Sequence, residues 1–192
     1  MREAGKRRRT IAQSSGSGTA RAFFALWPDQ PLRRQLAMWA GTAAQECGGR
    51  TMRTENLHLT LVFVGNVARE RLPLLHEIAA SLAMPDVKFD VDRIGCWRHN
   101  HIVWAAPAVV PQTLPRFVAG MEAALRDTGF ALDERPYVPH VTLVRNARRG
   151  PAAESIGPAR WEAGRFVLVE SVSGKNGVRY DVVGEWGTKR KG

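Results

Sequence analysis

Apolar residues recur along the chain with two spacings, one typical of helices and one typical of strands. Positions three and four residues apart predict helices over 31–46, 72–82 and 111–127. Short apolar or alternating runs predict strands over 22–27, 57–64, 89–91, 102–104, 137–144, 166–169 and 180–183. A polar turn at 98–101 links two of these strands as a hairpin. The pattern predicts an α+β fold whose strands are largely antiparallel.

The length and composition are those of one globular domain. The chain has 192 residues, of which 44% are hydrophobic and 24% are charged, close to the averages of globular proteins. Its longest apolar run, 102–110, contains Pro107 and is far shorter than the roughly 20 residues that span a bilayer. We therefore expect a single domain over 21–188 and no membrane partner.

Most of the net charge of +10 belongs to the two ends of the chain. Residues 1–20 carry +4 and residues 189–192 carry +3, which leaves 20 basic and 17 acidic residues over 21–188. We expect 1–20 to be a flexible basic tail and 189–192 to be a second basic tail. A nucleic-acid partner must be argued from the domain itself, because charges in tails are often only solvated.

The two cysteines give no sign of a disulfide framework. Cys47 and Cys96 lie far apart in sequence and form no Cys-x-x-Cys pair, which favours a reducing compartment. Residues 7–9 are basic, like the start of an export signal, but the Ser- and Gly-rich segment 13–18 stands where an apolar segment would have to follow. We expect a cytoplasmic protein.

One tetrapeptide pattern occurs twice, and each copy lies on a predicted strand that follows a helix. The copies are His58-Leu59-Thr60-Leu61 and His140-Val141-Thr142-Leu143. In a strand, the His and Thr of each copy point to one side and the apolar residues point to the other. Each copy therefore presents an imidazole beside a hydroxyl, and the repetition indicates an internal duplication.

Two imidazoles and two hydroxyls suit acid–base chemistry at a phosphate. If the two halves pack about an approximate two-fold axis, both pairs line one cleft. One imidazole could take a proton from the nucleophile while the other gives a proton to the departing oxygen. The hydroxyls of Thr60 and Thr142 would hold the non-bridging oxygens. A single His on a half-buried strand is more often structural, so the duplication is what favours catalysis.

These segments resemble the 2H phosphoesterases, specifically the RNA 2′,3′-cyclic phosphodiesterase branch, also described as 2′-5′ RNA ligases. The resemblance covers about 21–187 and includes both motifs within 21–26, 57–65, 91–95, 139–145 and 177–180. It implies a two-lobed, pseudo-symmetric fold in which sheets flanked by helices surround a central cleft. It also implies metal-independent chemistry without a cofactor, with His58 as proton donor and His140 as proton acceptor.

Arg145 closes the second motif segment, and the resemblance implies that it binds substrate. Strict alternation along the strand, however, puts its side chain on the face opposite His140. It reaches a phosphate only if the strand ends or twists after Val144. Arg148 and Arg149 could guide an RNA strand electrostatically, although a solvated loop explains them equally well.

Other kinds of site have weaker support. Cys96, His99 and His101 lie close together but match no metal-binding pattern and lack a fourth ligand, so we expect no metal. Trp97, beside the polar turn, is expected to be exposed, and three other tryptophans are expected in the core: Trp27, Trp39 and Trp104. The absence of a Gly-rich phosphate loop in the sequence disfavours an ATP-driven ligase.

We expect a monomeric phosphoesterase that opens RNA 2′,3′-cyclic phosphate ends, those of tRNA fragments included, to 2′-phosphomonoesters. Two other activities in the same cleft remain alternatives, the hydrolysis of a small cyclic nucleotide and the joining of 2′-5′ linked RNA. A non-catalytic RNA- or nucleotide-binding module is the alternative from a different class. Binding alone would not require two titratable groups, which favours an enzyme.

Overall fold

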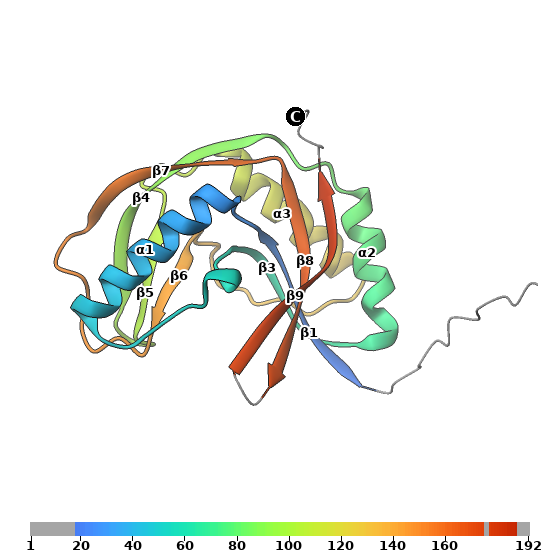
Figure 1. The fold of residues 1–192 in the computed structure, drawn as a ribbon. Coiled ribbons are helices and arrows are strands. Elements are labelled where there is room, and N and C mark those ends of the chain that lie inside the picture. Colours follow the sequence, from blue (N-terminus) through green and yellow to red (C-terminus); the bar gives the residue numbers. More distant parts are fainter. Residues whose placement is uncertain (1–17, 175–176, 188–192) are drawn as a thin grey trace, which may run out of the picture.

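A computed structural model describes residues 18–174 and 177–187 of the chain (Figure 1). Most of the two predicted basic tails lies outside these residues. The first strand, β1 (Thr19–Leu26), begins two residues before the expected start of the domain at Arg21. Ala20 and Ala22 are both buried in this strand, so the sheet extends further toward the N-terminus than the apolar run alone predicts.

Three α-helices lie where the sequence predicts them: α1 (Gln30–Cys47), α2 (Leu72–Ser81) and α3 (Thr113–Asp127). Asp29 caps α1 by accepting a hydrogen bond from the N–H of Leu32 (3.0 Å), and Gly48, with a φ of 70°, ends the helix. Each helix buries one apolar stripe, as the spacing predicts. Two short 3₁₀ helices, η1 (Thr54–Asn56) and η2 (Arg69–Arg71), were not predicted.

The strands form one sheet in the order β7-β4-β5-β6-β3-β1-β8-β9, with β2 paired to β6. The strands after β1 are β2 (Arg50–Thr51), β3 (Leu59–Ala68), β4 (Val87–Trp97), β5 (Ile102–Ala106), β6 (Val141–Arg145), β7 (Ser155–Ala163), β8 (Arg165–Gly174) and β9 (Gly177–Gly187). Each pairing within the described residues is antiparallel, which confirms the expected orientation. The separate sheets that were expected are instead two halves of one sheet.

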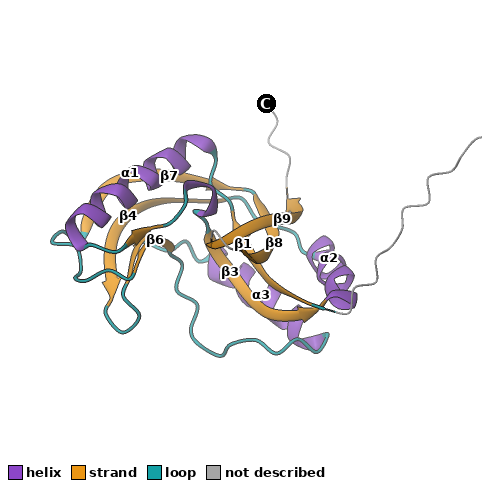
Figure 2. Ribbon diagram, turned by 60° about the horizontal axis from the view of Figure 1, so that its bottom comes forward, coloured by secondary structure: helices purple, strands orange, loops and turns teal. Residues whose placement is uncertain are grey.

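The two halves of the sheet meet at one residue pair. Among the described residues, β3 and β6 are paired only at Leu59 and Val141, whose side chains are both fully buried. On one half α1 packs against β6 and β7, and on the other α2 and α3 pack against β9 and β3 (Figures 1 and 2). Residues from all three helices and both halves belong to a single core. The helices therefore leave the opposite face of the sheet free for the site.

Two strands, β2 and β7, were not predicted, and most of the others differ from the prediction in their limits; three of the differences have a clear local reason. β3 continues past its predicted end because Gly65 adopts a φ of 85° and stays in the ladder. β6 begins only after Pro139, whose nitrogen cannot donate to a ladder. β7 was missed because Gly157 and Pro158 interrupt its pattern, although three alternate residues after them are buried: Ala159, Trp161 and Ala163.

Both motif strands contain a β-bulge at the same place. In β3 the pairing shifts at Leu61, and in β6 it shifts at Leu143. Consequently each of these leucines and the valine that follows it are both buried. One extra residue reverses the alternation of side chains beyond it. The next residues, Phe63 and Arg145, therefore return to the face that carries the motif threonines.

Candidate functional site

The four motif side chains lie on one face of the sheet, opposite the core. Leu59 and Val141 stand directly opposite each other in the ladder and point into the core. Directly opposite residues share a face, whereas neighbours along a strand alternate. The flanking residues therefore point the other way, and they are all half-buried: His58, Thr60, His140 and Thr142. These four side chains are termed the motif face below.

His58 is held by contacts at both ring nitrogens. Its Nδ1–H donates to the carbonyl of Asn56 (2.7 Å), and its Nε2 lies 3.1 Å from the hydroxyl of Thr60. A carbonyl can only accept, so Nδ1 carries a proton and Nε2 is the basic atom of the neutral ring. Asn56 is itself buried, and its side-chain amide donates to the carbonyl of Val178 on β9 (3.0 Å). The position of His58 is therefore tied to the β8–β9 hairpin.

His140 has an equivalent arrangement. Its Nδ1–H donates to the carbonyl of Val138 (2.8 Å), which lies two positions earlier, as Asn56 does relative to His58. The lone pair of the neutral ring is therefore again on Nε2. The duplication seen in the sequence thus extends to the hydrogen bonds, and each histidine has Nε2 as the atom that can exchange a proton.

Aromatic rings surround His58 on several sides. The ring centroids of Phe23, Trp27 and Tyr180 lie 4.9, 5.5 and 5.2 Å from that of His58, and the indole of Trp27 is nearly parallel to the imidazole. His140 has an edge-on aromatic neighbour, Trp97, at 4.5 Å. These rings shield the imidazoles from water, more completely at His58.

Three of the tryptophan predictions were wrong because sequence alone did not show which residues lie near the motifs. Trp27 was expected in the core and Trp97 in solvent, yet both are half-buried beside a histidine. Trp104 is also half-buried and stands opposite Thr142 in the ladder, on the motif face. Its indole lies over Gly95, where a Cβ would come within 2.4 Å of the ring. Gly95, which stands opposite Trp104 in the ladder, was the sequence feature that could have indicated where the indole lies.

Both histidines have pKa values below the ordinary value. Burial lowers the pKa of His58 to about 4, with the charges of His140 and Arg145 acting in the same direction and the bond to Asn56 opposing them. Burial also lowers the pKa of His140, aided by the charge of Arg145. Both imidazoles are therefore mainly neutral at pH 7 in the free protein.

Arg145 shares the motif face, contrary to strict alternation. In the ladder with β5 it stands opposite Ile102, which is half-buried, whereas the next residue, Val103, is fully buried. The cause is the bulge at Leu143, which adds one residue between Thr142 and Arg145. The guanidinium is close enough to lower the pKa of both histidines. β6 continues to Arg145, and the bulge reverses the alternation of its side chains.

Arg148 and Arg149 lie at the C-terminal end of α1. The backbone N–H of Arg148 donates to the carbonyl of Cys47 (2.8 Å), and Nε of Arg149 donates to the carbonyl of Glu46 (2.8 Å). Positive charge at a helix C-terminus is favoured by the helix dipole. These contacts favour a structural explanation for the two residues over the guidance of an RNA strand.

The described residues contain no group of three His, Cys, Asp or Glu side chains that could hold a metal ion. Of the three residues considered from the sequence, Cys96 packs against the core. Nδ1 of His101 donates to the carbonyl of Ala147 (3.2 Å). Two of the three side chains considered, those of Cys96 and His101, therefore make structural contacts.

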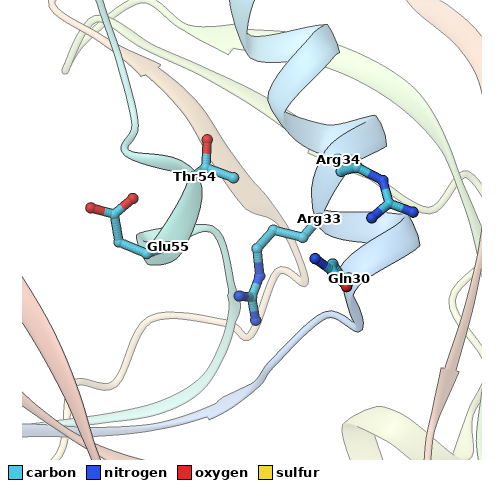
Figure 3. A pocket seen from close by; sticks show the side chains of 5 residues that line it. All are labelled: Gln30, Arg33, Arg34, Thr54 and Glu55. Carbon is cyan, nitrogen blue, oxygen red and sulfur yellow. The ribbon is translucent and has the colours of Figure 1, made fainter.

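A pocket lies between the start of α1 and η1 (Figure 3). It is lined by Gln30, Arg33, Arg34, Thr54 and Glu55. Arg33 extends across it and donates to the carbonyl of Pro28 (3.1 Å). None of the residues predicted from the sequence to act in catalysis lines this pocket.

The chain is similar to proteins of one family along most of its length. Residues 26–104 match the family model described as LigT like Phosphoesterase. The RNA 2′,3′-cyclic phosphodiesterase of Escherichia coli (strain K12) is 29% identical over 170 residues, or 86% of this chain and 95% of that protein. The crystal structure of E. coli LigT complexed with 3′-AMP has a TM-score of 0.79 at 27% identity, covering 90% and 99% of the two chains. The chain is therefore similar over most of its length to LigT-like phosphoesterases.

A more distant relative is the RNA 2′,3′-cyclic phosphodiesterase of Methanocaldococcus jannaschii, which is 25% identical over 178 residues, or 86% of this chain and 99% of that protein. The family model reaches His58 and Thr60 but ends before His140 and Thr142. In this chain the second motif is joined to the first by the Leu59–Val141 pair, and the histidines of the two motifs make equivalent hydrogen bonds. No helix in the described part of the chain has the length and apolar character needed to cross a membrane.

Proposed function

We propose that this phosphoesterase hydrolyses RNA 2′,3′-cyclic phosphate ends to 2′-phosphomonoesters by two-histidine acid–base catalysis. The observation that carries the proposal is the equivalent setting of His58 and His140 on the motif face. Each donates Nδ1–H to a backbone carbonyl and keeps Nε2 for proton transfer. The names of the relatives in E. coli and M. jannaschii support the same reaction.

In the proposed reaction water attacks the cyclic phosphate opposite the 3′ oxygen. Nε2 of His140 takes a proton from the water as its oxygen bonds to phosphorus. Nε2 of His58 gives a proton to the 3′ oxygen as the bond from phosphorus to that oxygen breaks, which leaves the phosphate on the 2′ oxygen. Thr60, Thr142 and Arg145 bind the non-bridging oxygens, where negative charge increases in the transition state.

The pKa values constrain this assignment. In the free protein the lower pKa of His58, about 4, favours its neutral form, whereas the proposed donor must be protonated. A bound phosphate carries negative charge, and an anion near an imidazole raises its pKa. We therefore propose that the bound substrate raises the pKa of the donor, which then takes up a proton from solvent, with His58 as donor by the family resemblance. The opposite assignment reverses the two roles without changing the groups.

The proposal extends to the substrate's source and the state of the enzyme. RNA ends left by cleavage, those of tRNA fragments included, supply a 2′,3′-cyclic phosphate. We propose that the protein acts as a monomer in the cytoplasm, in line with its free cysteines, Cys47 and Cys96. Small cyclic nucleotides and 2′-5′ linked RNA are the alternative substrates, and binding without catalysis is the alternative function.

The deciding experiment is incubation with a short RNA that ends in a 2′,3′-cyclic phosphate, with the product followed by phosphorus NMR. The expected product is a 2′-phosphomonoester. A 3′-phosphomonoester would keep the acid–base chemistry but reverse the orientation of the substrate. Binding without any product, in a protein whose fold is intact, would instead identify a binding module.

The same assay tests the role of metals. The proposed steps use only imidazoles, hydroxyls and a guanidinium, so we expect EDTA to leave the rate unchanged. A rate that EDTA abolishes and a divalent ion restores would replace this mechanism with a metal-dependent one.

A further inference from the structure

Two arginines stand side by side at the outer end of β6. Arg50 on β2 pairs directly with Arg145 in an antiparallel ladder, so the two side chains lie on the same face. Like charges at directly opposite positions are destabilising. Neither arginine forms an ion pair within residues 18–174 and 177–187. The fold therefore keeps two unneutralised cations next to each other.

The backbone on both sides of Arg50 holds this residue beside β6. After α1 ends, Gly48 and Gly49 have φ values of 70° and 95°, which turn the chain back alongside β6. A Cβ at Gly49 would come within 2.6 Å of the carbonyl oxygen of Arg145. Beyond β2 the backbone N–H of Met52 still donates to the carbonyl of Leu143 (2.8 Å). The contacts on both sides of Arg50 hold it against the strand that carries the second motif.

The two arginines continue the motif face outward. The bulge in β6 puts Arg145 on that face, and the charge of Arg145 lowers the pKa of both histidines. Arg50 lies one strand beyond Arg145 and is exposed to solvent. A ligand whose terminal phosphate contacts Arg145 would therefore pass Arg50 if it continued as a chain of phosphates.

We propose that Arg50 and Arg145 bind two successive phosphates of the RNA strand. Arg145 contacts the cyclic phosphate at the reacting end, and Arg50 contacts the neighbouring phosphodiester. A guanidinium can form two parallel hydrogen bonds with a phosphate, which suits both positions. A nucleoside 2′,3′-cyclic phosphate has no second phosphate, so Arg50 determines the preference for oligonucleotides over mononucleotides. This inference rests on the proposed function.

The test compares Arg50→Gln with the wild-type enzyme on two substrates, a dinucleotide and a mononucleoside that both end in a 2′,3′-cyclic phosphate. We expect kcat/KM for the dinucleotide to fall roughly 10- to 100-fold, mainly through KM, because one charged hydrogen-bonding contact is lost. We expect no change for the mononucleoside. Arg50→Lys should recover part of the loss. Arg116→Gln, an exposed arginine on α3, is the matched control and should change neither value.

Binding gives a second measure that does not depend on turnover. The affinity for a dinucleotide 2′-phosphate should fall in Arg50→Gln, and the slope of log affinity against log salt should decrease by roughly 0.7. Equal losses of kcat/KM on the dinucleotide and the mononucleoside would show that Arg50 only positions Arg145, and would overturn the proposal. An unchanged kcat/KM on both substrates would overturn it as well. A wild-type protein that binds the dinucleotide 2′-phosphate but turns over neither substrate would refute the proposed function. The binding comparison between wild type and Arg50→Gln would still decide the role of Arg50.

Discussion

At the scale of single residues, the chemistry of the site depends on which nitrogen of each imidazole is free. The carbonyls of Asn56 and Val138 accept Nδ1–H and leave Nε2 of His58 and His140 as the basic atoms. The two histidines nevertheless differ in their surroundings. His58 is enclosed by several aromatic rings and contacts Thr60. This burial explains why its pKa falls to about 4.

Replacement of either histidine should remove one proton transfer. We expect His58→Ala and His140→Ala each to reduce turnover of a cyclic-phosphate RNA by roughly 10²- to 10⁴-fold. A p-nitrophenyl phosphodiester, whose leaving group needs no proton, separates the roles: the donor variant should recover most of its activity and the acceptor variant should not. Recovery in His140→Ala instead of His58→Ala would reverse the assignment. Circular dichroism of both variants checks the fold.

The threonines should contribute less than the histidines. Thr60→Val and Thr142→Val each remove one hydroxyl and keep the size of the side chain, so we expect a loss of about 1–3 kcal/mol of transition-state stabilisation apiece. Thr60 also contacts Nε2 of His58, so its variant should shift the pH–rate profile as well. Steady-state kinetics measure both effects, and unchanged kcat/KM in both variants would contradict phosphate binding by the hydroxyls.

The pH dependence of kcat/KM follows from the two lowered pKa values. Activity requires one protonated and one neutral imidazole, so the profile should be bell-shaped. Because kcat/KM reports the free enzyme, and both pKa values lie below about 6.5, the optimum should also lie below about pH 6.5. Initial rates at low substrate concentration, measured from pH 3.5 to 9, test this. An optimum above pH 7 would show that the histidines are more solvated than the structure indicates.

At the scale of elements, the two β-bulges decide which side chains join the motif face. With regular alternation and no bulge at Leu143, Arg145 would point to the core side of the sheet instead. The equivalent bulge in β3 exposes Phe63, over whose ring the Arg21 guanidinium lies at 4.9 Å. The two halves therefore have the same backbone arrangement at the bulge but differ in the residue that follows it, which is an arginine after one motif and a phenylalanine after the other.

The hairpin of β4 and β5 should be sensitive to any side chain at position 95. A Cβ on Gly95 would come within 2.4 Å of the Trp104 indole, which must move from its place beside Thr142. We expect Gly95→Ala to destabilise the fold by about 1–3 kcal/mol and to reduce turnover, because the displaced indole disturbs the site.

Thermal unfolding and steady-state kinetics measure these effects. Gly41→Ala is the matched control, since a Cβ there meets nothing within 4 Å and α1 gains a better helix former. The expectation fails if Gly95→Ala is as stable as the control.

At the scale of the whole molecule, the two halves of the sheet are held together by the core beneath the site. Leu59 and Val141, the residues that join the halves, are the central residues of the two motifs. Stability and catalysis therefore share the same strands. The cost of this arrangement is that His58, next to the join, is buried enough to resist protonation.

Stability should therefore fall on mild acidification. The pKa of His58 is about 4 in the fold and about 6.5 in an unfolded chain, so the unfolded state binds more protons between these values. The contribution of His58 is fully present above about pH 6.5 and is lost as the pH falls toward 4. We expect the decrease in Tm from pH 7 to pH 4 to be smaller in His58→Asn than in the wild type. Identical decreases would show that His58 titrates normally in the fold.

Much of the fold follows from local sequence patterns. The three helices have apolar stripes and clear ends, and all were predicted within about two residues of their limits. The strands were harder to delimit because ladder partners set their ends. β7 depends on β4 for its pairing, and β2 has only two residues, too few for any pattern.

The sequence by itself determined that each half carries an imidazole beside a hydroxyl, because alternation along a strand is a property of the local backbone. Only the tertiary structure decided that Leu59 and Val141 pair and so bring the two halves of the site together. It also decided that Arg145 joins them, that Arg50 lies beside it, and that Trp27 and Trp97 touch the histidines. These features arise from register, bulges and ring contacts between segments distant in sequence, where the energies of pairing and packing outweigh local preference.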